Sequence, residues 1–169
     1  YRAAYFWEER NRWFSDVWEE ITGEHQALED DDLRDRSAAF PFEIPYRLVN
    51  MYSVYGDTVL DPFWGTGTTS LAAMAAARNS VGYEVEPEFV DLFDERVADV
   101  PGLSRAVARR RLADHRAFVD ARRDAGDAFG YEAAHYDFPV RTKQERSIRL
   151  YAVDDVTRTD RGYRAIHDP

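Results

Sequence analysis

The feature that most restricts the fold of this chain is residues 58–69, which read Thr-Val-Leu-Asp-Pro-Phe-Trp-Gly-Thr-Gly-Thr-Thr. The apolar start predicts a buried strand, Gly65 and Gly67 predict a tight turn, and a helix is expected from Thr68 onward. Asp61 ends the predicted strand, and the first N–H groups of the helix point toward the same space. This order predicts a small-molecule site between a strand end and a helix N-terminus.

The residues that follow predict a parallel α/β arrangement. An Ala-rich helix is expected over residues 68–78, a second strand over residues 80–84 and a further helix over residues 89–98. Strands that alternate with helices are typical of doubly wound parallel sheets. The predicted fold class is therefore α/β, with a partial Rossmann-like parallel sheet, flanking helices and a C-terminal α/β extension.

The chain divides into three predicted regions. Residues 1–36 are an aromatic, helix-like lead-in that ends in an acidic stretch, with residues 29–32 expected in a loop. Residues 37–100 hold the βαβ core, which is preceded by a short amphipathic helix at residues 46–52. Residues 101–169 form the extension, for which a long Arg-rich helix and two strands joined by a turn are expected. These elements are predicted at residues 104–125, 147–153 and 163–167, with the turn at residues 160–162.

The net charge of −10 is accompanied by an unusual choice of charged residues. Lys143 is the single lysine among 22 basic residues, and aspartates outnumber glutamates by 19 to 13. This pattern favours a surface adapted to high salt, where a Debye length of ~3 Å at molar salt screens the net charge. The alternative is an acidic protein that avoids nucleic acid, since DNA affinity normally depends on basic patches. We favour the first interpretation, so the acidity does not exclude DNA as a partner.

Composition disfavours several other classes of protein. Without cysteine the chain has no disulfide, thiolate metal site or cysteine nucleophile, and its four histidines lack metal-ligand spacing, so no metal is expected. No apolar run approaches the ~20 residues of a membrane span, and the N-terminus does not resemble a signal peptide. We therefore expect a cytoplasmic protein with no membrane partner. Because the sequence starts at Tyr1 rather than Met, we also expect that an upstream part is absent.

Two familiar cofactor motifs do not fit the glycine-rich turn. The dinucleotide pattern G-x-G-x-x-G is incomplete because Ser70 stands at its third glycine, and a P-loop needs a lysine where Thr68 stands. A carboxylate nevertheless ends the second predicted strand: Glu84 follows Asp61 by 23 positions. Doubly wound folds place the acid that binds ribose hydroxyls at a similar offset, ~20 residues on. The turn therefore predicts a nucleoside-containing ligand of another kind.

Three segments in this order resemble the S-adenosylmethionine-binding part of the DNA amino-methyltransferases, which methylate N4 of cytosine or N6 of adenine. They are residues 40–49, 56–69 and 78–84, and the resemblance covers roughly residues 13–98. In the permuted members of this family, a Phe-Pro pair precedes the glycine motif and the catalytic motif lies further towards the N-terminus. Phe40-Pro41 is such a pair. Together with the high-salt composition, the resemblance suggests a haloarchaeal source.

The resemblance implies S-adenosyl-L-methionine as cofactor, double-stranded DNA as substrate and a methyltransferase version of the Rossmann-like fold. It implies that Glu84 holds the ribose hydroxyls, that Val85 lies near adenine, and that Phe40 and Pro41 lie near the amino-acid end of the cofactor. The remaining implied cofactor-binding residues are Asp61, Pro62, Phe63, Gly65, Gly67, Thr68 and Thr69.

The catalytic motif of that family is missing from these residues. It consists of Asp, Asn or Ser, then Pro-Pro, then an aromatic, and it holds the amine of a flipped base. The sequence has no Pro-Pro pair, and its nearest string, residues 137–140, has one proline with no aromatic after it. We therefore assign no catalytic residue and expect the cofactor-binding half of a site-specific DNA methyltransferase, inactive alone, whose catalytic portion lies upstream.

Alternatives remain open at this stage. An RNA methyltransferase would need its Pro-Pro motif after Glu84, and a non-catalytic S-adenosylmethionine- or DNA-binding module would have lost the motif. The sequence leaves the target base, the recognition sequence, a restriction partner and the oligomeric state undecided.

Two further patterns have both a functional and a structural interpretation. In the functional interpretation, three tryptophans stack on bases, and in the structural one they pack in a core: Trp7, Trp13 and Trp18. We expect the core, because their spacing is near-helical. Seven arginines between Arg105 and Arg123 would contact phosphates in the first interpretation. We expect a solvated, salt-bridged helix face instead.

Overall fold

The structure is a computed structural model that describes residues 5–21 and 40–168, so the acidic stretch at residues 29–32 lies outside the described residues. The helices are α1 (Trp7–Trp13), α3 (Glu43–Tyr52), α4 (Thr68–Ala75), α5 (Pro87–Arg96) and α6 (Val100–Asp124), with 3-10 turns η1 (Val97–Asp99) and η2 (Lys143–Ser147). The strands are β1 (Thr58–Asp61), β2 (Asn79–Gly82), β3 (Tyr131–Glu132), β4 (Pro139–Val140), β5 (Ala152–Thr159) and β6 (Gly162–Asp168). Within this described part, no helix combines the length and apolar character needed to cross a bilayer.

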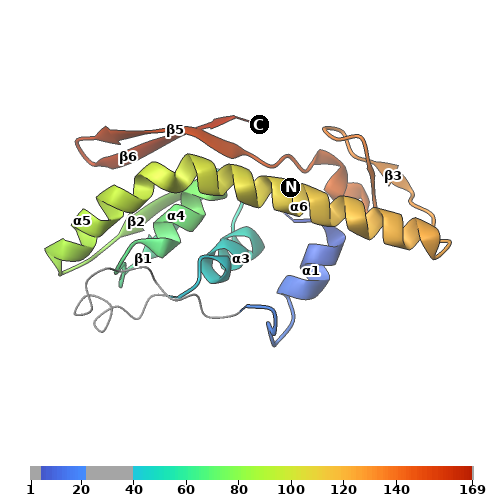
Figure 1. The fold of residues 1–169 in the computed structure, drawn as a ribbon, viewed down its shortest axis with the longest axis horizontal. Coiled ribbons are helices and arrows are strands. Elements are labelled where there is room, and N and C mark those ends of the chain that lie inside the picture. The colour runs from blue at the N-terminus through green and yellow to red at the C-terminus, as the bar shows by residue number, and fades with distance from the viewer. Residues whose placement is uncertain (1–4, 22–39, 169) are drawn as a thin grey trace.

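The predicted βαβ unit is present, which confirms the α/β class. Strands β1 and β2 pair in parallel, with Val59 opposite Ser80 and Leu60 opposite Val81, and α4 connects them. Val59 packs with the α3–α4 core, and the Ser80 hydroxyl bonds to α4, so these two residues define the covered face of the pair. Figure 1 shows α6 running along the molecule, with the hairpin β5–β6 beside its first half.

The end of α4 comes earlier than the sequence indicated. The helix stops at Ala75 instead of residue 78, because Ala77 adopts a left-handed φ of 58° and the N–H of Arg78 turns back to the Ala73 carbonyl at 2.8 Å. A left-handed residue just after a helix is a common stop signal, but it is usually glycine. Since alanine gives no such signal, the boundary was missed.

The strand predicted over residues 147–153 is wrong, although the hairpin itself is confirmed. Strand β5 begins at Ala152 and pairs antiparallel with β6 across the predicted turn. Upstream of β5, Ile148 and Leu150 alternate in sequence because both are buried against Phe6 and Phe138. The alternation of apolar residues therefore comes from a segment that packs on a core and does not pair with a neighbouring strand.

The core joins all three regions of the sequence. One cluster contains Trp13 from α1, Tyr46 and Val49 from α3, three alanines from α4 and the turn after it, and Val107 from α6. Trp13 is 2% exposed, which confirms its predicted place in the core. Trp7 and Trp18 are half-buried beneath arginine side chains. Trp13 thus packs in the core, whereas Trp7 and Trp18 each pack against an arginine of the same chain.

The arginines of α6 mostly face acceptors within the protein. Arg110 contacts Glu43 at 2.6 Å, and Arg105 donates to the Val153 carbonyl at 3.3 Å. Further ion pairs are Arg116–Asp137 and Arg122–Asp127. This pairing supports the interpretation of α6 as a salt-bridged helix.

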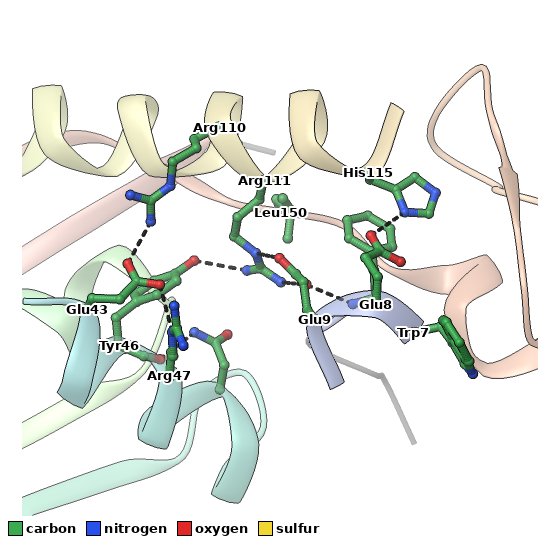
Figure 2. A network of polar contacts seen from close by, with 12 residues as sticks. Trp7, Glu8, Glu9, Glu43, Tyr46, Arg47, Arg110, Arg111, His115 and Leu150 are labelled. Atoms are coloured by element: carbon green, nitrogen blue, oxygen red, sulfur yellow. Dashed lines mark hydrogen bonds and ion pairs between the residues drawn. The ribbon is translucent and has the colours of Figure 1, made fainter. Parts of the chain in front are cut away.

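A buried polar junction connects α1, α3 and α6 (Figure 2). Arg111 of α6 holds both oxygens of Glu9 at 2.6 and 2.7 Å, and also donates to the Tyr46 hydroxyl at 2.9 Å. All three side chains are almost fully buried. Burial alone would lower the pKa of Arg111, but the adjacent Glu9 carboxylate raises it well above its usual range. The guanidinium is therefore fixed in its charged form.

His115 is a second buried basic side chain between α6 and α1. Its Nδ1 lies 2.7 Å from Glu8 Oε1 and its Nε2 lies 3.1 Å from the Pro139 carbonyl. Both partners are acceptors, so only the doubly protonated imidazolium form of the ring can donate to both of them. Burial lowers the pKa of His115, but the hydrogen bond and charge of Glu8 outweigh it and the pKa is raised.

We expect stability to fall as the pH rises through the raised pKa of His115. The protonated ring contributes its full stabilisation below the unfolded pKa of ~6.5, and this is lost above the folded-state value. Urea unfolding between about pH 6 and pH 9 should show a loss of about 1.5–3 kcal/mol, the scale of one hydrogen bond to a charged group. The loss should be absent from Glu8→Gln and retained in His135→Gln, since His135 is exposed. Parallel curves for wild type and Glu8→Gln would contradict this assignment.

Candidate cofactor-binding site

The predicted ligand-binding segment forms the turn between β1 and α4. Gly65 and Gly67 adopt left-handed φ values of 52° and 73°. Nothing lies within 4 Å of a Cβ added at Gly65, whereas one added at Gly67 would overlap the Phe93 ring. Gly65 is therefore required by its backbone angle, and Gly67 by both angle and space.

Trp64 lies under the turn and was not singled out from the sequence. Its indole N–H donates to the Ser70 hydroxyl at 2.7 Å, and its ring occupies the space that a side chain at Gly82 would need. Ser70 also contacts the Ser80 hydroxyl at 2.9 Å. The serine that breaks the dinucleotide pattern thus connects α4 to β2 and to the turn.

Glu84 joins the end of β2 to the turn after β1. One carboxylate oxygen, Oε2, accepts the Gly65 N–H at 2.7 Å, and the other accepts the N–H groups of Val85 and Glu86 at 2.7 and 3.0 Å. The bonds from Glu86, Val85 and Gly65 hold the pKa of Glu84 below its usual range. The carboxylate thus bonds to the turn, a contact not predicted from the sequence, and Oε2 keeps one acceptor position for a ligand.

Arg96 of α5 supports the turn from behind. It donates to the Thr66 carbonyl at 2.6 Å and to the Thr66 hydroxyl at 2.8 Å, and it lies 3.3 Å from the Thr68 hydroxyl. Thr66 and Thr68 are buried, so Thr68 directs its hydroxyl into the protein. At the start of α4, the backbone N–H groups of Thr68 and Thr69 have no intrahelical partner and are the groups left for a ligand. No local sequence signal distinguished Arg96 from other helix surface arginines.

The outer rim of the turn is open to solvent. Asp61 accepts the Phe63 N–H at 3.0 Å through Oδ1. Phe63 is 91% exposed and Val85 is 89% exposed, and Pro62 is also exposed. Two carboxylates are therefore bordered by apolar side chains, an arrangement that suits a ligand with both polar and aromatic parts.

The Phe-Pro pair lies directly before α3. Phe40 is 42% exposed and Pro41 is half-buried. The next residue, Phe42, packs against the cluster that contains Phe93 and Trp64. The Phe-Pro segment thus packs against the support of the turn through Phe42, which is not among the site residues predicted from the sequence.

A large groove lies elsewhere in the described part of the chain. It has a volume of about 1200 Å³ and lies between α1, the end of α3 and η2, near the amino end of β1. None of the predicted cofactor residues lines it. We base the site on the turn, because the carboxylates and free helix N–H groups are there.

Comparison with known proteins identifies relatives of the turn and its surroundings. The N6/N4 DNA methylase family matches residues 1–95. The Type II methyltransferase M.MthZI of Methanothermobacter thermautotrophicus is 51% identical over 149 residues, which is 88% of this chain and 41% of that protein. The Type II methyltransferase M.MjaI of Methanocaldococcus jannaschii is 50% identical over 97 residues, or 57% of this chain and 31% of that protein. The matched region therefore covers less than half the length of either relative.

Solved structures with similar sequences come from Thermus thermophilus. The crystal structure of a putative DNA modification methylase is 43% identical and has a TM-score of 0.47, covering 56% of this chain and 36% of that one. A second crystal structure of that methylase, complexed with S-adenosyl-L-methionine, is 38% identical with a TM-score of 0.44, covering 55% and 32%.

Proposed function

Since this chain belongs to the N6/N4 DNA methylase family, we propose that it binds S-adenosyl-L-methionine as the cofactor-binding part of a DNA methyltransferase. The observation that carries the proposal is the placement of Asp61 and Glu84. They lie at the carboxyl ends of two adjacent parallel strands and flank the glycine turn at the start of α4. In open α/β sheets, ligands bind at this edge. The proposed reaction transfers a methyl group to N4 of cytosine or N6 of adenine.

The polar groups of the turn suit the parts of the cofactor. Glu84 Oε2 is proposed to accept a hydrogen bond from a ribose hydroxyl. The Asp61 carboxylate is proposed to accept a hydrogen bond from the methionine ammonium group. The free N–H groups at the start of α4 suit the methionine carboxylate, because a helix N-terminus attracts anions. Exposed Val85 offers an apolar contact for adenine, exposed Phe63 lines the methionine and ribose side, and Phe40 and Pro41 are assigned to the amino-acid end.

The uncovered face of the strand pair suggests how the catalytic part is attached. Leu60 and Val81, opposite each other, are 62% and 45% exposed, and Tyr83 is 64% exposed. Parallel sheets are normally covered on both faces. We therefore propose that the catalytic part, with the Pro-Pro motif in the permuted order, packs on this face and contacts double-stranded DNA.

Two further proposals concern the setting of the protein. The scarcity of lysine supports a high-salt cytoplasm, and the Type II relatives support a restriction partner.

Calorimetric titration of S-adenosyl-L-methionine into this chain tests the proposal. We expect saturable binding by the wild type and at least about tenfold weaker binding by Asp61→Ala, since a hydrogen bond to a charged group contributes about 1.5–3 kcal/mol. Asp57→Ala is the matched control, because Asp57 precedes the amino end of β1 and likewise accepts one local backbone N–H. Absence of binding by folded wild type, at both low and molar salt, would reject the cofactor assignment.

A further inference from the structure

The hairpin β5–β6 lies outside the family match, yet it packs directly on the core of the cofactor-binding unit (Figure 1). Val153 of β5 is fully buried, and its N–H donates to the Ser104 hydroxyl of α6 at 2.9 Å. Tyr163 and Ala165 of β6 pack against a cluster that includes Phe93 of α5. The hairpin is therefore attached to both α5 and α6.

Two side chains of the hairpin converge on a single carboxylate of α5. The Tyr163 hydroxyl donates to Asp94 Oδ1, and Arg158 contacts Asp94 Oδ2 at 2.6 Å. The Tyr163 ring also meets the Phe93 ring edge-on, with centroids 5.7 Å apart. Consecutive residues of α5 are thus held by the hairpin, one through packing and the other through hydrogen bonds.

The same helix face touches the glycine turn. The centroid of Phe93 lies 4.6 Å from that of Trp64, and Phe93 fills the space next to the Gly67 Cα. Arg96, three residues along α5, holds the Thr66 carbonyl. A continuous set of contacts therefore runs from Tyr163 through Phe93 to Trp64 and Gly67.

We infer that the β5–β6 hairpin positions the cofactor-binding turn, with Tyr163 as the principal positioning residue. The inference rests on the proposed function. Because Phe93 occupies the space beside Gly67 and Arg96 holds the Thr66 carbonyl, the ligand-binding geometry of the turn depends on the packing beneath it. A turn held in place before binding loses less conformational freedom when the ligand arrives, so affinity is higher. A substitution in the hairpin that loosens its packing on α5 should therefore weaken cofactor binding, although the substituted residue does not contact the cofactor.

Two measurements on the full chain test this inference. Hydrogen exchange of the segment 62–70, without ligand, should be about tenfold faster in Tyr163→Ala than in wild type, because exchange follows local opening. The Kd for S-adenosyl-L-methionine should rise about tenfold in Tyr163→Ala, with a smaller rise in Tyr163→Phe, which keeps the ring against Phe93. If Tyr163→Ala does not fold, Asp94→Ala replaces it, since this variant removes the acceptor of both hairpin bonds.

Tyr136→Ala is the matched control for general destabilisation. Tyr136 also lies in the extension and also uses both its ring and its hydroxyl, but it belongs to a different cluster. Its ring stacks on Phe138, and its hydroxyl accepts the Leu150 N–H at 2.8 Å. Equal exchange rates in the two variants at segment 62–70 would overturn the inference. If wild type fails to bind the cofactor, the proposed function falls, while the exchange comparison still decides whether the hairpin orders the turn.

Discussion

Arg111→Met is expected to lower the free energy of unfolding by about 3–5 kcal/mol, because it leaves the Glu9 carboxylate buried without its counter-ion. Glu9 is 3% exposed and Arg111 is 4% exposed, so water cannot replace the lost partner. Domains of this kind are stable by only about 5–15 kcal/mol. Urea unfolding followed by circular dichroism should therefore find a large drop in the denaturation midpoint of the variant relative to wild type.

A double-mutant cycle separates the ion pair from its surroundings. Glu9→Leu combined with Arg111→Met should be less destabilised than the sum of the two single variants, since apolar replacement of a buried pair removes both desolvation costs. Arg110→Met is the control: its partner Glu43 is also acidic, but Arg110 is 55% exposed, and an exposed pair contributes at most about 1 kcal/mol. A loss in Arg111→Met no larger than in Arg110→Met would show that the junction is not a stabilising unit.

This junction illustrates what the sequence did not reveal. Glu9 and Arg111 are 102 positions apart, and each belongs to a helix rich in both charges. Periodicity indicates that α6 has a charged face, but it does not distinguish the arginine that turns toward the core from those that pair at the surface. That choice depends on the position of α1, which only the assembled fold defines.

The elements of the βαβ unit were predictable because their signals are local. Strand β1 has the predicted bounds, and the first residue of α4 is the predicted Thr68. A glycine turn, an apolar strand and an Ala-rich helix each fix their own conformation over a few residues. The neighbourhood of Gly65 and Glu84 followed from parallel pairing, since both positions lie past the carboxyl ends of neighbouring strands.

Contacts that depend on packing were not predictable in the same way. Trp64 fits the turn only because Gly82, on the neighbouring strand, lacks a side chain. Thr68 is one of the implied cofactor-binding residues, but its side chain is buried and its hydroxyl lies 3.3 Å from the Arg96 guanidinium. The support beneath the turn therefore comes from α5, through Phe93 and Arg96.

Glu84→Ala is expected to weaken S-adenosyl-L-methionine binding at least about 100-fold, the largest effect that we predict for the site. The carboxylate accepts three backbone N–H groups that shape the turn and the start of α5, and it is also the proposed ribose ligand. Loss of a charged acceptor from two such roles corresponds to about 2.7 kcal/mol or more, which is about 100-fold in Kd. Calorimetry of Glu84→Ala against Glu95→Gln, an exposed acid on α5, measures the effect.

The two roles of Glu84 can be separated with a change in the ligand. Wild type should prefer adenosine to 2′,3′-dideoxyadenosine, because only adenosine offers hydroxyls to Oε2. Glu84→Gln removes one carboxylate oxygen while keeping the size of the side chain, so it should lose that preference as well as affinity. If Glu84→Gln binds both ligands more weakly but keeps the wild-type ratio, the carboxylate orders the turn through Gly65 and does not hold the ribose. The ratio of the two affinities, more than either affinity alone, therefore decides whether Glu84 is a cofactor ligand.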